Sequence, residues 1–296
     1  MKDVNISPIF YMGCKRRLIN KGLISLFPTE ISTFVDVFGG SGIVSMNVQA
    51  ESYILNDIDS NLYTLYKLFK TEEADVIINH INARIDEYGL ARERTKRNEY
   101  KDKDKIEEYK AAYKKLRDFY NSSEKDVKDF YTLLFYSFSQ QFRFNKDGDF
   151  NMPCGNDCFT ETNAGYIRKG CDFFSKSNLV LSNRDFRKVL EEAKDNRTFV
   201  YLDPPYLGTT ATYNENNGWS DKDEQDMYRL LNELTNKDIK WAMSNVGRHK
   251  GEDNKGLMDW VNEQGYAVYN FDKMNYTSLG RGNVNAKEIL IRNWKD

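Results

Sequence analysis

Residues 198–206 read TFVYLDPPY and combine a strand pattern with an abrupt break. The mostly apolar run 198–202 predicts a buried strand. The two prolines that follow cannot donate a backbone hydrogen bond, so they end the strand. They leave the carboxylate of Asp203 and the carbonyl of Pro204 free to accept hydrogen bonds, with the ring of Tyr206 beside them. Two acceptors and a flat ring suit a planar group with an exocyclic amine, such as an adenine turned out of a duplex.

Similar apolar runs occur on both sides of this stretch. Further strands are predicted at 31–37, 53–55, 178–182, 238–245, 266–271 and 288–293, and helices at 43–51 and 61–70. Strands that alternate with helices predict an α/β fold with a doubly wound, mainly parallel sheet and helices on both faces.

The block between the second and third predicted strands has a different character. Residues 71–121 are charged and helical in period, and 130–142 predict a more apolar helix. Residues 143–151 (RFNKDGDFN) place an Asp-Gly turn between two short extended arms, which predicts a β-hairpin. We therefore expect a catalytic domain of residues 1–70 and 172–296, interrupted by a mainly helical inserted domain of residues 71–171.

The composition limits the classes of function. The chain has 296 residues and a net charge of −2, which argues against a uniformly basic nucleic-acid binder but leaves room for a local basic groove. Four irregularly spaced cysteines and no secretory leader predict a reducing, cytoplasmic setting. No apolar run approaches membrane-spanning length.

Three loops follow predicted strands and carry candidate ligand-binding groups. Residues 36–42 (DVFGGSG) resemble a nucleotide loop, because glycines let the backbone approach a ligand; a tight strand-to-helix turn is the alternative. Asp57 ends the second strand, where a carboxylate can accept hydrogen bonds from ribose hydroxyls. Asp185 ends the third strand and could accept from the amino group of an adenine cofactor. A helix N-cap is the alternative for each of the two aspartates.

Three further groups of residues could take part in function. Residues 11–17 (YMGCKRR) suggest either a solvated basic helix start or a clamp over a ligand carboxylate, with Lys15 also near phosphate. Cys154, Cys158 and Cys171 have poor spacing for zinc and no histidine nearby, so no metal is expected. His80 and His249 have no partner that the sequence reveals, so we expect both at the surface.

These segments together resemble one family, the S-adenosylmethionine-dependent amino-methyltransferases of DNA, and above all the Dam-like adenine methyltransferases of the alpha group. The ordered set covers nearly the whole chain: residues 11–15, 36–42, 56–58, 150–155 (FNMPCG), 203–206, 242–245 and 281–283. Cys14 departs from the family pattern, where a second glycine is common. The acidic hairpin tip at 146–149 is unusual for a base-reading element and leaves the recognised sequence open.

The resemblance implies direct methyl transfer from S-adenosylmethionine to N6 of a flipped-out adenine in double-stranded DNA, with a GATC-like target as the family expectation. The implied catalytic residues are Asp203, Pro204, Pro205 and Tyr206. The implied cofactor-binding residues are Tyr11, Lys15, Asp36, Phe38, Gly39, Gly40, Gly42, Asp57, Ile58, Asp185 and Phe186. The implied DNA-binding residues are Arg143, Asn145, Lys146, Asn151 and Arg281. One catalytic unit per chain favours a monomer, with a transient dimer as the alternative, in a bacterial or phage setting.

Other readings stay open. The acceptor could be RNA, a protein glutamine or cytosine N4, although those families more often carry Asn-Pro-Pro-Tyr or Ser-Pro-Pro-Tyr than the Asp203 motif. Cytosine C5 enzymes attack with a Pro-Cys cysteine, but Pro153-Cys154 follows the predicted hairpin and is expected to be structural. A catalytically silent DNA-binding homologue is a further alternative. A nicotinamide dehydrogenase is disfavoured by the glycine spacing.

Overall fold

The structure, a computed structural model, describes residues 4–94, 103–193, 195–206, 219–249, 252–271, 274–277 and 283–295. The chain divides into two compact units. The helical unit comprises Met1–Cys14, Gly40–Met46 and Ser60–Ser177, and the sheet unit comprises Lys15–Gly39, Asn47–Asp59 and Asn178–Asp296. The helical unit thus takes in 1–14, 40–46, 60–70 and 172–177, which the sequence predicts as parts of the catalytic domain.

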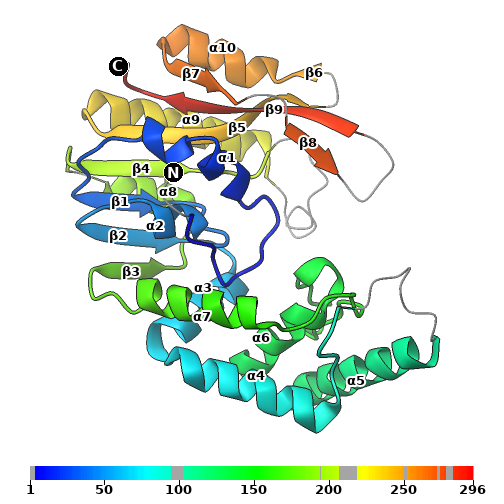
Figure 1. Cartoon of the computed structure of the whole chain (residues 1–296). Helices are drawn as coiled ribbons and strands as arrows, with labels where there is room; N and C mark the ends of the chain where they lie inside the picture. The colour runs from blue at the N-terminus through cyan, green and yellow to red at the C-terminus, as the bar shows by residue number, and fades with distance from the viewer. Residues whose placement is uncertain are drawn as a thin grey trace. The chain divides into compact units, whose positions relative to one another are not determined.

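The sheet unit is built on a mainly parallel sheet, as predicted. In the described residues its strands run in the order β3-β2-β1-β4-β5-β9-β7, with β6 beside β5 and β8 beside β9 (Figure 1). The parallel strands are β1 (Thr33–Asp36), β2 (Ser52–Asn56), β3 (Leu179–Ser182), β4 (Thr198–Leu202) and β5 (Lys240–His249). Antiparallel pairs join β9 (Asn283–Arg292) to β5, β7 (Ala267–Asn270) and β8 (Met274–Thr277), and β6 (Glu252–Asp253) to β5.

Alternation along the strands gives the sheet two apolar faces. Val35, Val200 and Leu202 pack on one face in a core shared with α8 (Phe186–Glu192), α9 (Asp221–Asn236) and α10 (Lys255–Gln264). Phe199 and its neighbours point to the other face, where the ring of Phe27 lies 4.9 Å from that of Phe199. Phe27 directly follows η1 (Leu23–Leu26), and Figure 1 draws α1 (Arg16–Asn20) in front of the sheet with α8 and α9 behind it. The fold is therefore the doubly wound, Rossmann-like arrangement that the sequence predicted.

The helical unit contains most of the remaining helices. They are α2 (Ile43–Asn47), whose last residue belongs to the sheet unit, and α3 (Ser60–Thr71), α4 (Ala74–Tyr88), α5 (Lys103–Ser122), α6 (Val127–Tyr136), η2 (Phe138–Gln140) and α7 (Glu161–Phe174).

Asp129 of α6 is 1% exposed and accepts hydrogen bonds from Arg84 of α4 at 2.7 and 3.1 Å. His80 Nε2 lies 2.7 Å from the same carboxylate. The surface position expected for His80 is therefore wrong, because this histidine is half-buried in an ion-pair network.

The predicted helix 130–142 ends early, at Tyr136. Ser137 has extended dihedrals and pairs with Cys154 in an isolated β-bridge, which draws the chain out of the helix. A Cβ at Gly155 would lie 2.5 Å from the carbonyl oxygen of Ser137, so this crossing requires a glycine. The predicted hairpin follows, with one bridge between Phe144 and Phe150.

Candidate functional site

The chemistry-bearing loops lie at the carboxyl edge of the parallel strands. β1 and β4 are neighbours, and the chain leaves them toward opposite sides of the sheet, to β2 and to β5. Open α/β sheets bind ligands outside the carboxyl ends of the strands at such a switch of direction. The pairing of β1 with β4 continues one residue past β1, because Val37 N donates to Tyr201 O at 3.0 Å. Phe38 and Asp203 therefore come directly after the paired segments of these two strands, at the switch point.

Asp203 is held in a closed triangle of side chains. The Lys15 ammonium lies 2.8 Å from Asp203 Oδ2 and donates to the hydroxyl oxygen of Tyr206 at 3.0 Å. The Tyr206 hydroxyl in turn donates to Asp203 Oδ1 at 3.1 Å. The Lys15 side chain is 6% exposed, whereas the Asp203 side chain keeps 20% of its surface accessible. The triangle therefore fixes the carboxylate while leaving part of it open to an incoming donor.

Burial and charge act against each other in this triangle. Burial disfavours the Lys15 ammonium, but the attraction of Asp203 raises its pKa well above the usual range. Burial raises the pKa of the Asp203 carboxyl, and Lys15 and Tyr206 oppose part of that rise. Burial also raises the pKa of the Tyr206 hydroxyl well above its usual range. Lys15 therefore stays charged, and Tyr206 stays a neutral hydrogen-bond donor.

A second buried acid shares this face of the sheet. Glu288 of β9 is 4% exposed and lies opposite Val246 of β5, two positions from Ser244. Ser244 lies within 2.7 Å of the Tyr201 hydroxyl, so alternation puts Glu288 on the face that carries Tyr201. Burial raises the pKa of Glu288, and Lys15 counteracts that rise. Sequence reasoning missed this residue, although a glutamate that opens an apolar strand run was the available signal.

Asn56 ties together the ends of three strands. Its side chain is 1% exposed and donates to the carbonyls of Val37 after β1, at 2.9 Å, and Arg184 after β3, at 3.0 Å. From the sequence, Asn56 is only the first residue of the family-like segment 56–58. It fixes the loops that carry Phe38, Asp57 and Asp185.

Asp57 and Ile58 follow Asn56 directly. Asp57 Oδ1 accepts from the backbone N–H of Asp59 at 2.9 Å in a local turn, and the residue as a whole is half-buried. Ile58 is 66% exposed, the largest exposed fraction among the large apolar side chains of the described residues. An acceptor beside a bare apolar side chain suits a ribose joined to a flat base.

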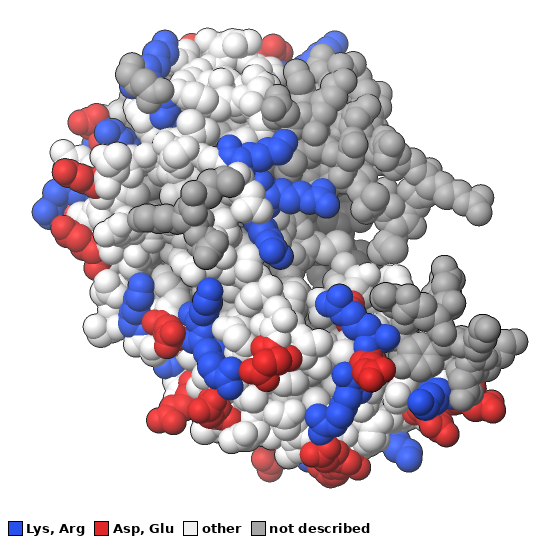
Figure 2. Space-filling model, viewed as in Figure 1, with Lys and Arg blue, Asp and Glu red and all other residues white. Residues whose placement is uncertain are grey.

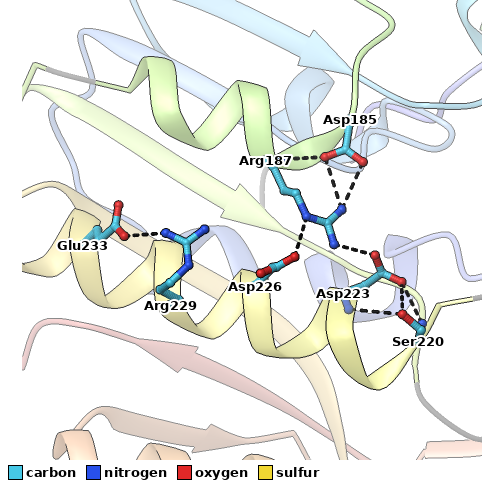
Figure 3. Close-up of polar contacts among 7 residues, drawn as sticks. All are labelled: Asp185, Arg187, Ser220, Asp223, Asp226, Arg229 and Glu233. Carbon is cyan, nitrogen blue, oxygen red and sulfur yellow. Dashed lines mark hydrogen bonds and ion pairs between the residues drawn. The ribbon is translucent and has the colours of Figure 1, made fainter.

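Asp185 serves as the N-cap of α8. Its Oδ1 accepts from the backbone N–H of Arg187 at 2.8 Å, and the Arg187 guanidinium bonds both of its oxygens (Figure 3). The cap that was the alternative reading is thus present. The Asp185 side chain is still 37% exposed and keeps lone pairs for another donor.

The glycine loop is divided between the two units, and its second part belongs to the helical unit. Gly40 has φ +52°, and a Cβ there would lie 3.1 Å from the Tyr11 ring. The Tyr66 hydroxyl donates to the Gly40 carbonyl at 2.5 Å, and Gly42 has φ +73°. Both glycines adopt left-handed backbone that other residues seldom tolerate, which accounts for the motif.

Comparison with known proteins gives the family. The model of the D12 class N6 adenine-specific DNA methyltransferases matches residues 11–275. The chain belongs to this family. It is 30% identical to modification methylase StsI of Streptococcus sanguinis over 98% of its own length, and 32% identical to type II methyltransferase M.FokI of Planomicrobium okeanokoites over 97%. It is also 29% identical to modification methylase LlaI of Lactococcus lactis over 99%. The chain spans only 43–44% of the length of these relatives.

Most of the candidate DNA-binding residues in the hairpin of this D12-class chain form hydrogen bonds within the hairpin itself. Arg143 Nε donates to Asn151 Oδ1 at 2.8 Å across the hairpin. Asn145 Oδ1 accepts from two backbone N–H groups of the turn, those of Asp147 and Asp149. Lys146 is exposed at the tip, and Arg281 lies outside the described residues. The side-chain oxygen of Asn145 therefore shapes the turn, while Arg143 and Lys146 keep N–H groups for an external partner.

Cys154, which follows the hairpin, is half-buried and has a free thiol. Burial raises the pKa of the Cys154 thiol to about 11, so a thiolate is scarce at neutral pH. Among the described residues, no group of three or more His, Cys, Asp or Glu side chains is arranged to hold a metal ion. No helix in the described part of the chain combines the length and apolar character needed to cross a bilayer.

One open pocket lies away from these loops. It measures about 600 Å³ and is lined by residues before the parallel strands, among them Glu51, Arg197 and Lys240. These are the amino ends of the strands, the edge opposite to Asp203. Its position therefore separates it from the predicted chemistry.

Proposed function

We propose that this chain transfers a methyl group from S-adenosylmethionine to N6 of a flipped-out adenine at specific sites in double-stranded DNA. The observation that carries the proposal is Asp203, a partly accessible carboxylate at the switch point of the sheet, fixed by Lys15 and Tyr206. Membership of the D12 class supports the reaction and the acceptor.

The loops at the carboxyl edge fit the cofactor by their chemistry. Ile58 offers an exposed apolar side chain, and the half-buried Asp57 and the capping Asp185 offer acceptors for a ribose and an adenine. We propose that these residues bind S-adenosylmethionine together with Tyr11, Asp36, Phe38, Gly39, Gly40, Gly42 and Phe186. When bound, this group supplies an activated methyl on a sulfonium.

Asp203 and the Pro204 carbonyl would orient the amine. The exocyclic nitrogen of adenine is a poor nucleophile, because its lone pair is delocalised into the ring. Two acceptors for its two N–H groups favour a tetrahedral nitrogen with the lone pair free for the methyl. A carboxylate has about four lone-pair sites, so Asp203 can hold Lys15 and Tyr206 and still accept the amine. Alignment of the reacting atoms then supplies much of the rate.

We assign Lys15 to the catalytic carboxylate instead of to a ligand carboxylate. Its ammonium keeps Asp203 ionised despite burial, so that the carboxylate accepts hydrogen bonds from the neutral amine and can accept the N6 proton that must leave once the nitrogen carries the methyl. The Tyr206 ring would stack on the extruded base and offset part of the few kcal/mol lost on unstacking. Its hydroxyl bond to Asp203 fixes the ring beside the acceptors.

DNA contact is proposed for three parts of the chain. We assign target recognition to the inserted domain, residues 71–171, through Arg143, Asn145, Lys146 and Asn151, and we add Arg281. Lys and Arg side chains also gather over α1, where Arg16, Arg17 and Lys21 are exposed (Figure 2). Such a local basic group suits phosphate contacts in a chain of net charge −2.

The biological role and the target sequence are further proposals. The names of the similar proteins, modification methylases and type II methyltransferases, favour a restriction–modification role. The GATC-like target, a monomeric state and a cytoplasmic location in a bacterial or phage setting stay predictions from the sequence.

The deciding experiment is nucleoside mass spectrometry. Unmethylated duplex DNA is incubated with the protein and S-adenosylmethionine, with Asp203→Ala as the control. N6-methyladenine from the wild type alone supports the proposal, and sequencing of the product then maps the target. N4-methylcytosine, or a methylated RNA or glutamine in parallel reactions, would move the assignment to another acceptor. No product on any acceptor, with DNA binding retained, would identify a silent homologue.

A further inference from the structure

Three aromatic rings meet at the carboxyl end of β1. Phe38 lies 5.7 Å from Phe186 and 5.7 Å from Trp219, and Phe186 lies 5.3 Å from Trp219, measured between ring centroids. All three belong to the sheet unit. Phe38 opens the glycine loop, Phe186 follows Asp185, and Trp219 directly precedes the N-cap of α9. The cluster therefore joins two predicted cofactor residues to one that no motif singled out.

The three rings differ in what they can offer a ligand. Phe186 is 5% exposed, and the Arg187 guanidinium lies over its ring at 4.4 Å. Phe38 and Trp219 are only partly buried at the margin of the core. The aromatic surface left for a ligand at this edge thus comes from Phe38 and Trp219.

Trp219 is held in place by a network between α8 and α9. Ser220 and Asp223 form a reciprocal capping box at the start of α9. The Arg187 guanidinium reaches across from α8 to Asp223 at 2.6 Å and to Asp226 at 2.8 Å, while also bonding Asp185 (Figure 3). Arg187 therefore links Asp185, the N-cap of α8, to the first turn of α9, which directly follows Trp219. This link fixes the position of the indole relative to the Asp185 carboxylate.

We propose that Trp219 is a cofactor-binding residue, whose indole is the aromatic wall for the adenine base of S-adenosylmethionine. The inference rests on the proposed function. Adenine has a flat face for the indole and an exocyclic amine for an acceptor, and Asp185 is 37% exposed within the same network. The Trp219 indole is already held in place at the start of α9, so little conformational entropy is lost when the base binds, and this favours binding.

Calorimetry with S-adenosylmethionine and with S-adenosylhomocysteine tests the inference. Trp219→Leu keeps apolar bulk without an aromatic face, and should weaken both ligands equally, roughly 5- to 150-fold, the range for losing one base–aromatic stack. Trp294→Leu is the matched control, because Trp294 is also half-buried but packs on Phe199 at the amino edge of the sheet. It should bind as the wild type does.

Tryptophan fluorescence gives a second test, which still applies if Trp219→Leu fails to fold. Addition of S-adenosylmethionine should quench tryptophan fluorescence in the wild type and in Trp294→Phe, and this response should disappear in Trp219→Phe. Unchanged affinity in folded Trp219→Leu, or the full response in Trp219→Phe, would overturn the inference. A wild type that binds neither ligand would overturn the proposed function instead, so the two failures are distinguishable.

Discussion

The Lys15 ammonium lies 2.8 Å from the Asp203 carboxylate, although one residue precedes the first helix of the sheet unit and the other follows its central strand. Both side chains are largely buried, so each is the principal counter-charge of the other. Breaking a buried ion pair by removing one partner costs about 3–5 kcal/mol, because a charge is left uncompensated. The stability of the site therefore depends on the protonation state of the Asp203 carboxylate.

Removal of Lys15 should make catalysis sensitive to acid. Lys15→Met takes away the charge that opposes the burial-induced rise in the pKa of Asp203, so that pKa increases further. The acid limb of the single-turnover rate profile should move to higher pH, and activity should recover as the pH is raised. Lys15→Arg keeps the charge and should shift the limb less. An acid limb at the same pH in Lys15→Met would separate Lys15 from Asp203.

Loss of the Asp203 acceptor should affect transfer and spare cofactor binding. Asp203→Ala should lower the methyl-transfer rate by at least roughly 10²–10³-fold, the effect of removing one preorganised group. Calorimetry should give an affinity for S-adenosylmethionine close to that of the wild type. Substantial remaining transfer would rule out the assigned role.

Asp57 should contribute to cofactor affinity, and Asp57→Ala should lower that affinity more than Asp57→Asn. Asp57→Ala should weaken S-adenosylmethionine binding by roughly 1–3 kcal/mol if hydrogen bonds to the ribose are lost. Asp57→Asn keeps an oxygen for the N–H of Asp59 and should lose less. Equal affinities for wild type and Asp57→Ala would remove this residue from the site.

Asp129 should stabilise the helical unit at neutral pH. Its hydrogen bonds to His80 and Arg84 outweigh the effect of burial and lower its pKa. With a folded pKa below the unfolded value of about 3.9, the group contributes stability above that pH and loses it as the pH falls through the folded pKa. Asp129→Ala should cost roughly 1.5–3 kcal/mol at neutral pH, the value of hydrogen bonds to a charged group.

Chemical denaturation at neutral and acid pH checks the effect of Asp129. The difference between wild type and Asp129→Ala should shrink on acidification. Asp118→Ala is a suitable control, because Asp118 forms an exposed pair with Lys114 of the kind that contributes little. A difference that grows in acid would contradict the assignment.

Arg143 should contribute to DNA binding. Arg143→Ala removes a cation from the hairpin and breaks its bond to Asn151, so affinity should fall. A shallower dependence of log K on log salt, with unchanged sequence preference, would make it a phosphate contact, whereas relaxed preference at one base pair would make it a base contact. Lys146→Ala isolates the effect of charge at the tip. Wild-type affinity and salt dependence in Arg143→Ala would exclude the residue from the interface.

Local sequence patterns were enough to predict the mainly parallel sheet and the edge where the chemistry lies. The apolar run 198–202 ended by two prolines, and the loops after 31–37 and 53–55, are local patterns, because strand burial and backbone breaks depend on neighbouring residues. Such patterns also carried the resemblance that the family match confirmed. They misjudged the end of α6, since Ser137 leaves the helix to pair with distant Cys154.

Which side chains meet could be read only from the folded chain. The sequence suggests a solvated helix start or a ligand clamp for Lys15, and packing brings its ammonium to Asp203. Packing also brings Trp219 to Phe38. Glu288 enters the site because strand pairing and alternation put it on the face of Tyr201. Contacts between residues far apart in the chain depend on register and helix packing, whose free energies are summed over the whole core. No short stretch of sequence contains that information.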